Sequence, residues 1–208
     1  MSHAASNSLL IVISAPSGAG KTTLCQQLLA ACPEVTRAVT CTTRTPRTGE
    51  AEGVDYYFLD AAAFLRRVDA GEFIEHATVY GYSYGVLRSE LLTKLRQGQD
   101  VLLNVDVQGA ATIRSQALED PELRRSLVMV FLVPPSPTEL EQRLRKRAAD
   151  SEEVIQRRLG AARQETRQWK QFDYLLISTT ILEDLRRMLV ILEAERMRSS
   201  RVAPPAGA

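Results

Sequence analysis

The sequence has no long hydrophobic run and few cysteines, and both shortages narrow what the chain can be. Its longest early apolar run spans residues 9–13, far below the ~20 residues that a membrane-spanning helix needs. The three cysteines are odd in number and lack metal-ligand spacing, and no basic segment with a cleavable apolar stretch precedes them. We therefore expect a soluble protein of the reducing cytoplasm, with no membrane partner.

Neither sign of charge is in excess. The formal net charge of +1 gives no reason to expect nucleic acid or an anionic membrane as a partner. Hydrophobic residues make up 45% and charged residues 25% of the 208 positions, a composition typical of a globular protein with one core and small appended modules. Any anion-binding site must therefore come from local clusters of Lys and Arg.

Short apolar runs alternate with segments of helical period. The runs are almost uninterrupted, as in strands buried on both faces of a parallel sheet, and they span residues 9–14, 101–106, 127–133 and 174–178. Helical segments follow Gly20, begin at the capping box that Ser136 opens, and begin near Thr180. This alternation predicts an α/β fold with a doubly wound parallel sheet at its core.

Two stretches break the alternation and divide the chain. Residues 37–92 are rich in Tyr, Gly and Thr and predict a helix at about residues 61–69 among short strands, as in an inserted substrate module. Residues 143–168 are dense in Arg and Glu and predict a mobile helical hairpin. The remaining parts, residues 1–36, 93–142 and 169–208, then form the core, with a flexible C-terminal tail.

A glycine-rich loop follows the first apolar run and opens the first helical segment. Its sequence is Ala15-Pro16-Ser17-Gly18-Ala19-Gly20-Lys21-Thr22-Thr23. In this context the loop matches a P-loop, whose backbone N–H groups turn toward one anion at the positive end of the helix. Lys21 would reach the β and γ phosphates and the Thr22 hydroxyl would ligate magnesium, so the loop predicts binding of a magnesium–nucleoside triphosphate. A P-loop alone does not distinguish a phosphotransferase from a regulatory nucleotide-binding module.

A second set of polar residues lies in the 37–92 segment. Arg44 and Arg47 flank Pro46, and two guanidinium groups on a stiff turn can grip the oxygens of a second phosphate. Glu75 and Tyr84 follow further along the chain. Taken singly, the two arginines are as often part of a solvated loop, Glu75 is as often an edge-strand charge, and Tyr84 is as often a packing aromatic. Their joint occurrence downstream of a P-loop argues for a second substrate site.

In the order and spacing of these motifs the chain closely resembles the guanylate kinases over about residues 8–197. The resemblance implies that segment 37–92 is the GMP-binding module and segment 143–168 a lid. It also implies the reaction of ATP and GMP to ADP and GDP, with magnesium bound to ATP. We expect a monomer or a small homo-oligomer, with ATP and GMP as its partners.

The same resemblance implies roles for individual acceptor-side residues. Those matching the family's GMP-phosphate ligands are Arg44, Arg47, Tyr56 and Tyr84, while Thr40 stands near the base. Glu75 matches the carboxylate that reads guanine. Guanine presents two adjacent donors, N1–H and N2–H, which an ionised carboxylate accepts as a pair, whereas adenine presents an acceptor at N1. A site built for one base edge discriminates by perhaps ~10⁴-fold, because the wrong ligand leaves buried polar groups unpaired.

The catalytic groups are expected at the end of a strand and on the lid. Asp106 ends the apolar run 101–106, where ligands gather in a parallel sheet, and is placed to hold magnesium or to contact the acceptor. The resemblance implies that lid arginines close over the transferring phosphoryl group. The cations assigned to catalysis are Lys21, Arg44, Arg143, Arg147 and Arg158.

The chain departs from the family's pattern at three sites, which comprise four positions. Asn104 replaces a usual Asp, Val86 replaces a common Ser or Thr that bonds guanine, and Ser178 with Thr179 replaces a frequent Asn-Asp near the donor adenine. Two alternatives to a guanylate kinase remain. A related P-loop kinase acting on a sugar phosphate such as ribose 1,5-bisphosphate would need no base reader. A non-catalytic guanylate-kinase-like interaction module would not need the intact phosphate loop.

Overall fold

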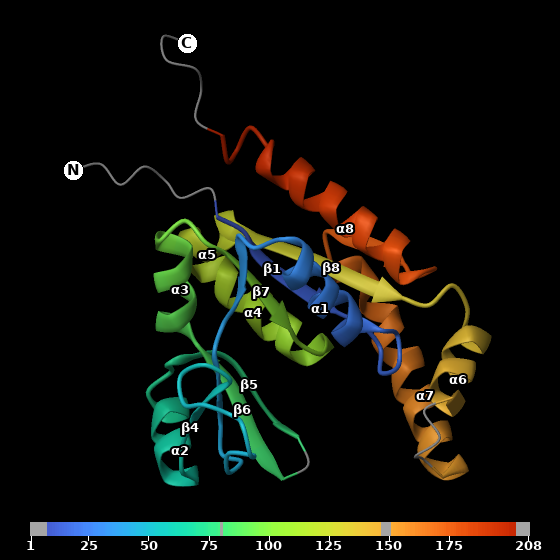
Figure 1. Cartoon of the computed structure of the whole chain (residues 1–208), viewed down its shortest axis with the longest axis horizontal. Helices are drawn as coiled ribbons and strands as arrows, with labels where there is room; N and C mark the ends of the chain where they lie inside the picture. The colour runs from blue at the N-terminus through green and yellow to red at the C-terminus, as the bar shows by residue number, and fades with distance from the viewer. Residues whose placement is uncertain (1–7, 80, 147–150, 203–208) are drawn as a thin grey trace.

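The structure is a computed structural model that describes residues 8–79, 81–146 and 151–202. Figure 1 shows a central sheet between layers of helices, with two smaller parts projecting from it. In chain order the elements are β1 (Leu10–Ser14), α1 (Lys21–Ala31), β2 (Val35–Arg37), β3 (Thr40–Thr42), β4 (Tyr56–Phe58), α2 (Ala61–Asp69), β5 (Phe73–Val79), β6 (Tyr82–Leu87), α3 (Arg88–Arg96), β7 (Asp100–Asn104), α4 (Val107–Glu119), α5 (Pro121–Ser126), β8 (Leu127–Val133), α6 (Pro137–Lys146), α7 (Glu152–Thr166), the 3₁₀ helix η1 (Arg167–Gln171), β9 (Tyr174–Ile177) and α8 (Ile181–Arg196).

The central sheet has five strands in the order β2-β7-β1-β8-β9, and all of its pairings are parallel. Because neighbouring strands are not consecutive in the chain, helices must cross from one edge to the next. All four predicted apolar runs become strands of this sheet. The predicted fold class, a doubly wound parallel α/β sheet, is confirmed.

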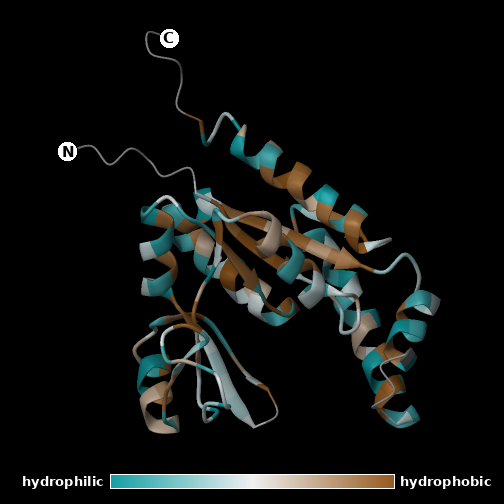
Figure 2. Ribbon diagram, in the orientation of Figure 1, coloured by the Kyte–Doolittle hydropathy of each residue, from teal (hydrophilic) through white to brown (hydrophobic). Residues whose placement is uncertain are grey.

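Helices cover both faces of this sheet, which explains why its strands are apolar without interruption (Figure 2). Along β1, Ile11 and Ile13 pack with α1 and α8, while Leu10 and Val12 pack with α3 and α4 on the opposite face. Successive side chains of a strand point to opposite faces, so both sets must be apolar. The carboxyl ends of the strands are thereby held as one rigid edge.

A second sheet, in the order β4-β3-β6-β5, forms most of the inserted module. One of its faces packs against α2 in a small core of Cys41, Phe64 and Phe73. Helix α2 has the bounds that the sequence predicted, and the Asp60 side chain caps it by accepting from the backbone N–H of Ala63 at 2.6 Å. The other face of this sheet is left to line the pocket described below.

Helices α6 and α7 form a charged helical hairpin that begins at Pro137, six residues before the predicted segment 143–168, and it projects from the opposite end of the core from the module (Figure 1). They share a small apolar core made by Leu140, Leu144, Ile155, Leu159 and Ala162. Helix α6 also lies against the phosphate loop, because a Cβ added at Gly18 would come within 2.7 Å of the Leu144 side chain. Among the described residues, no helix is long and apolar enough to cross a membrane.

Candidate active site

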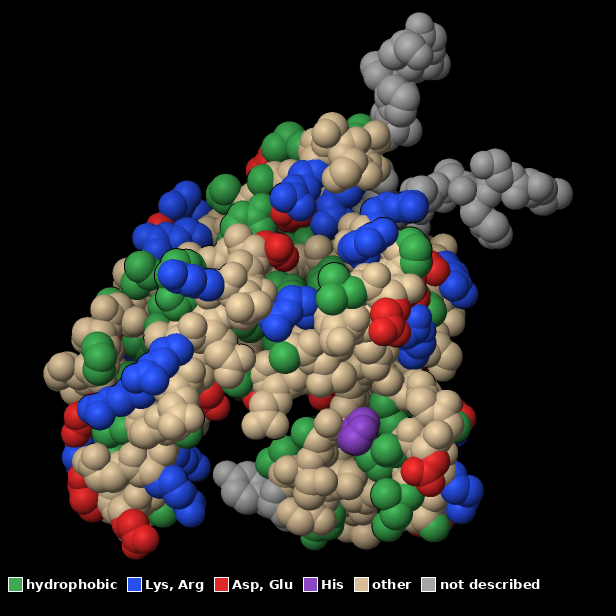
Figure 3. All heavy atoms as spheres, turned by 180° about the vertical axis from the view of Figure 1, so that it is seen from behind, with side chains coloured by type: hydrophobic (Ala, Val, Ile, Leu, Met, Phe, Trp, Pro, Cys, Tyr) green, Lys and Arg blue, Asp and Glu red, His purple; other side chains and the backbone are tan. Residues whose placement is uncertain are grey.

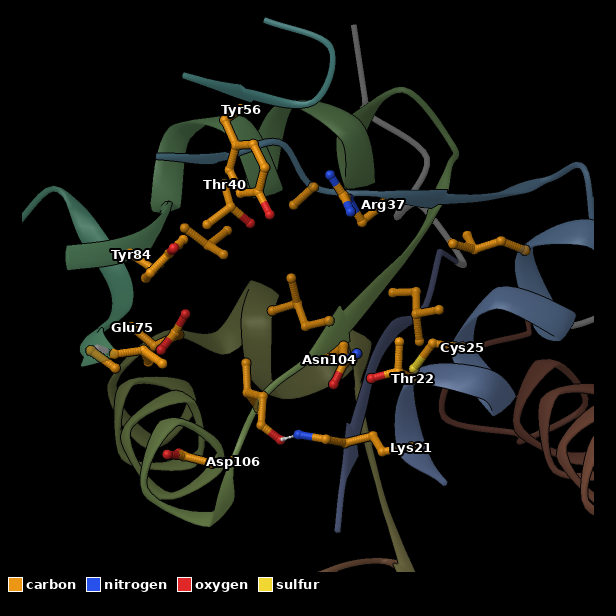
Figure 4. A pocket seen from close by; sticks show the side chains of 18 of the residues that line it. Lys21, Thr22, Cys25, Arg37, Thr40, Tyr56, Glu75, Tyr84, Asn104 and Asp106 are labelled. Atoms are coloured by element: carbon orange, nitrogen blue, oxygen red, sulfur yellow. Dashed lines mark hydrogen bonds between the residues drawn. The ribbon is translucent and has the colours of Figure 1, made fainter. Parts of the chain in front are cut away.

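A pocket of about 470 Å³ lies between the carboxyl ends of β2 and β7, the start of α1 and the open face of the module sheet (Figure 4). The space-filling view shows the molecule hollowed beneath the core, between the hairpin of α6 and α7 and the module (Figure 3). The predicted site residues that line the pocket are Lys21, Thr22, Thr40, Tyr56, Glu75, Tyr84 and Asp106. Residues from three separate segments are thus brought to one cavity.

The phosphate loop has the backbone that the motif requires. Gly18 and Gly20 have φ angles of 93° and 97°, in the left-handed region that glycine adopts without strain. Gly20 is the N-cap of α1, and Lys21 and Thr22 begin that helix. The loop therefore opens onto the positive end of a helix, where an anion is stabilised.

Lys21 points along the end of β7, and its Nζ donates to the backbone oxygen of Val105 at 2.6 Å (Figure 4). Burial lowers the pKa of this amine, and nearby negative groups such as Asp106 and Glu165 counter the effect. Cys25 lies beside it, and burial raises the pKa of that thiol to about 12, so the thiol stays protonated. Lys21 is a preorganised cation at the floor of the pocket.

Asp106 does not end a strand, as the sequence predicted, but begins the next helix. Strand β7 stops at Asn104, and the Oδ1 of Asp106 accepts from the backbone N–H of Gly109 at 2.8 Å as the N-cap of α4. The cap fixes the carboxylate at the pocket wall, and its Oδ2 accepts no hydrogen bond from a described residue. Within the described part of the chain, no group of three or more His, Cys, Asp or Glu residues could hold a metal unaided. A magnesium ion would therefore depend on phosphate oxygens for its remaining ligands.

Glu75, Val86 and Thr40 lie side by side on three adjacent strands of the module. Val86 pairs with Thr40 of β3 on one side and with Glu75 of β5 on the other, so the three side chains share the pocket face of the sheet. Glu75 is 9% exposed. A Cβ added at Gly109 would come within 3.0 Å of its Oε2, so that glycine makes room for the carboxylate.

Burial raises the pKa of Glu75 to about 7, and the negative charge of Asp106 adds to the rise while Lys21 opposes it. The protonated form of this carboxyl group is therefore favoured more than in an ordinary glutamate in the unliganded protein. Two donors arriving together from a ligand would favour the ionised form. The row is suited to reading a flat polar edge.

The predicted phosphate grip is only partly assembled. Arg44 lies 5.4 Å from the Tyr56 ring centroid, but its guanidinium pairs with Glu50 through contacts of 2.7 and 2.9 Å and does not line the pocket. Arg47 is exposed and lies outside the pocket lining, and its backbone N–H donates to Glu50 at 2.8 Å. Tyr56 and Tyr84 do face the cavity, with ring centroids 6.2 Å apart.

Arg37 is a pocket residue that the sequence did not point to. It ends β2, its Nη2 donates to the backbone oxygen of Asp55 at 2.8 Å, and its guanidinium lies 5.9 Å from the Tyr56 ring centroid (Figure 4). It precedes the pair formed by Arg44 and Arg47 and is not part of any motif that the sequence analysis identified. Its position at the carboxyl end of a sheet strand was the one signal available.

The three arginines that the resemblance assigns to a lid differ in how close they lie to the glycine-rich loop. Arg143 of α6 reaches the phosphate loop, where its Nη1 donates to the backbone oxygen of Ala19 at 3.2 Å and to the Ser178 Oγ at 3.2 Å. Arg158 is half-buried on α7 and does not line the pocket. Arg147 lies outside the described residues.

A phosphate loop that shares one cavity with an acid-bearing acceptor module defines the class, a P-loop kinase that phosphorylates a small molecule. Comparison with known proteins gives the particular family. The sequence model described as guanylate kinase matches residues 7–195. Guanylate kinases of Cereibacter sphaeroides and Syntrophotalea carbinolica are each 42% identical to this chain; the alignments cover 93% and 97% of it and 89% and 92% of the relatives.

A solved structure gives the same answer. The crystal structure of a guanylate kinase from Anaplasma phagocytophilum is similar to this chain with a TM-score of 0.70 and 35% identity, over 96% of this chain and 92% of that one. The chain belongs to the guanylate kinase family. The family predicted from the sequence is confirmed, in preference to the two alternatives.

Proposed function

We propose that this guanylate kinase moves the γ-phosphoryl group of ATP to GMP, giving ADP and GDP, across the pocket between the phosphate loop and the module. The observation that carries the proposal is the row of Thr40, Val86 and Glu75, which turns a buried carboxylate toward the cavity that Lys21 also lines. A base reader and a phosphate cation in one cavity fit a nucleotide acceptor better than a sugar phosphate.

On the donor side, the loop of residues 15–23 would bind the triphosphate through its backbone N–H groups, and Lys21 would reach its terminal phosphates. Magnesium would accompany ATP and neutralise charge on the phosphates. The residues present fit the ion, because the Thr22 hydroxyl faces the pocket and one oxygen of Asp106 has no donor among the described residues. Hard oxygen donors of this kind suit magnesium, which keeps several of its waters.

On the acceptor side, Tyr56 and Tyr84 would bind the GMP phosphate together with Arg44 and Arg47. The Arg44 guanidinium is ion-paired with Glu50, so it must share or leave that ion pair to bind a phosphate. Arg37 adds a further cation near the Tyr56 ring, 5.9 Å from its centroid. Charge-assisted contacts of this kind position the acceptor, and positioning with charge neutralisation is most of the catalysis in phosphoryl transfer.

Residues 143–168 would act as the lid, with Arg143, Arg147 and Arg158 closing on the transferring group, and residues 37–92 as the GMP-binding module. Closure of a charged lid excludes the water that would otherwise hydrolyse ATP. We also propose that the protein works in the cytoplasm as a monomer or a small homo-oligomer. Its three cysteines are buried free thiols, which agrees with a reducing compartment.

A coupled assay with ATP, magnesium and each nucleoside monophosphate in turn tests the proposal. We expect rapid ADP formation with GMP and slow formation with AMP, CMP or UMP. Ribose 1,5-bisphosphate serves as the second acceptor class. Turnover of that sugar phosphate in place of GMP, or tight GMP binding without turnover, would contradict the proposal.

Val86 offers a prediction specific to this chain. It lines the pocket between Thr40 and Glu75, where a hydroxyl could bond guanine. A neutral hydrogen bond is worth ~1 kcal/mol, so Val86→Thr should lower KM for GMP by about fivefold and leave kcat unchanged. Val79→Thr, at the edge of the same pocket, is the matched control and should change neither constant.

The burial of Val86 defines the result that would contradict this prediction. Val86 is 3% exposed and belongs to the core cluster that includes Ile74 and Leu91. If Val86 serves only that core, the threonine hydroxyl gains no partner and costs stability. A flat or raised KM together with a lower Tm would show that a neighbour such as Thr40 already supplies the contact.

A further inference from the structure

Asp184 is a buried carboxylate that the phosphoryl transfer described above does not use. It lies in the first turn of α8 and is 3% exposed, outside the pocket lining. Its Oδ2 accepts from the Ser178 hydroxyl at 2.7 Å, and its Oδ1 accepts from the backbone N–H of Thr179 at 2.9 Å. Burying an ionised carboxylate is costly unless it is well bonded, so its partners reveal what it serves.

Ser178 connects this carboxylate to the phosphate loop. Its hydroxyl donates its proton to Asp184 and accepts from Nη1 of Arg143 at 3.2 Å. The same Nη1 donates to the backbone oxygen of Ala19, within the loop, at 3.2 Å. Four groups, from α8, the residue after β9, α6 and the loop, are therefore joined in one hydrogen-bonded chain.

Two of the three guanidinium nitrogens of Arg143 donate hydrogen bonds to described residues. Its Nε donates to Glu139 Oε1 at 3.0 Å, and its Nη1 makes the two contacts above. Its Nη2 donates to no described residue. A fixed guanidinium beside a phosphate loop, with one nitrogen unused, is a preorganised ligand for phosphate oxygens.

The carboxylate sets the direction of the hydroxyl. Because Ser178 gives its single proton to Asp184, its lone pairs remain for Arg143, and the negative charge strengthens both bonds of the chain. With a neutral residue at position 184, the hydroxyl is free to rotate and Arg143 loses a defined acceptor. The loss would appear as a misplaced cation at the donor phosphates.

We propose that Asp184 is a positioning residue for the donor nucleotide: through Ser178 it holds Arg143 against Ala19, which leaves Nη2 to bind the phosphates of ATP. The proposal rests on the proposed function, because it takes Arg143 as a donor-phosphate ligand. Ser178 and Thr179 are also the pair that departs from the family's frequent Asn-Asp. The Asp184–Ser178 pair gives this chain its own means of fixing the arginine.

The test compares Asp184→Asn and Ser178→Ala with the parent enzyme. Asparagine keeps the volume and can still accept from Thr179, so it removes mainly the charge and the acceptor of the Ser178 proton. Each variant should lower kcat/KM for ATP by about tenfold, the value of one charge-assisted contact, and leave KM for GMP unchanged. Thr180→Ala is the matched control, since it removes the cap that accepts from the Glu183 N–H of the same helix. It should lower Tm without changing the kinetics.

Combination with Arg143→Ala separates positioning from structure. If Asp184 acts through Arg143, Asp184→Asn should change kcat/KM for ATP little in the Arg143→Ala background, whereas independent effects would multiply. Multiplying effects, or a loss of Tm with unchanged ATP kinetics, would overturn the inference. If Arg143→Ala alone leaves ATP turnover normal, the proposed role of Arg143 fails first. If Arg143→Ala is impaired and Asp184→Asn is not, this inference alone fails.

Discussion

Replacing Lys21 with alanine should lower kcat by at least ~10³-fold, because the change removes a charge that counters the negative charge developing on the transferring phosphoryl group. The position of Lys21 supports so large an effect. Its amine is already fixed at the pocket floor by the Val105 carbonyl and loses little freedom when phosphate arrives. The measurement is the coupled assay at saturating ATP and GMP.

The folded state of this variant should be unharmed. Burial lowers the pKa of Lys21, which means that the charged amine is a cost to the unliganded protein and not a source of its stability. Tm should therefore hold or rise slightly in Lys21→Ala. Lys170→Ala, at an exposed position of η1, serves as the control and should turn over normally. Near-normal turnover in a folded Lys21→Ala protein would refute the phosphate-loop assignment.

The features that the sequence predicted well are those that depend on local patterns. Strand β8 at 127–133 and helix α2 at 61–69 have the predicted bounds, because a continuous apolar run and a helix preceded by a capping Asp60 are set by neighbouring residues. The phosphate loop is equally local, since its glycines and the helix that follows lie in one short segment.

Of the features that were missed, one is a local boundary between a strand and a helix, and the others depend on how separate segments come together in the fold. Asp106 was expected at the end of a strand, but β7 ends at Asn104 and Asp106 is the N-cap of helix α4. The side chain of Arg37 enters the pocket because β2 pairs with β7, more than sixty positions away. The turn between β9 and α8 brings Asp184 to the Ser178 hydroxyl, which also accepts from Arg143. The spacing of these residues in the sequence does not predict this hydrogen-bonded chain.

Glu75 had a sequence signal but not its most informative property. Its place after Ile74 was compatible with an exposed edge-strand charge. Only the fold shows that the carboxylate is buried near Asp106, which raises its pKa to about 7. Burial is a property of everything packed around a residue, so no pattern within one strand could have predicted it.

Glu75→Gln should reverse much of the base preference of the enzyme. The carboxylate accepts both guanine donors, whereas the glutamine amide can accept one and must turn an N–H group toward the other. We expect KM for GMP to rise by about 10²-fold, while the ratio of AMP to GMP turnover improves by a comparable factor. Steady-state kinetics with both acceptors measures this. Arg44→Ala is the comparison, since weakening a phosphate ligand should affect GMP and AMP about equally.

The pKa of Glu75 makes the same variant informative about pH. Only the ionised carboxylate accepts two donors, so KM for GMP in the parent enzyme should rise as the pH falls below about 7. Stability should instead rise as the pH falls, while the affinity for GMP decreases. The folded pKa lies above the ordinary value of 4.5, so this residue's contribution to stability is complete below that pH and is lost as the pH rises through about 7. Glutamine carries no charge and should show neither dependence.

Chemical unfolding at several pH values therefore provides a second, independent readout of Glu75. At pH 8 the buried charge costs the parent a few kcal/mol, and Glu75→Gln should be more stable by roughly 2 kcal/mol, a gain that disappears on acidification. A variant that loses guanine preference yet becomes more stable at high pH identifies a carboxylate kept for binding at the expense of the fold. If Glu75→Gln leaves the preference for GMP over AMP unchanged, the base reader lies elsewhere. A stability gain without that loss would mean that the pocket buries Glu75 for some purpose other than reading guanine.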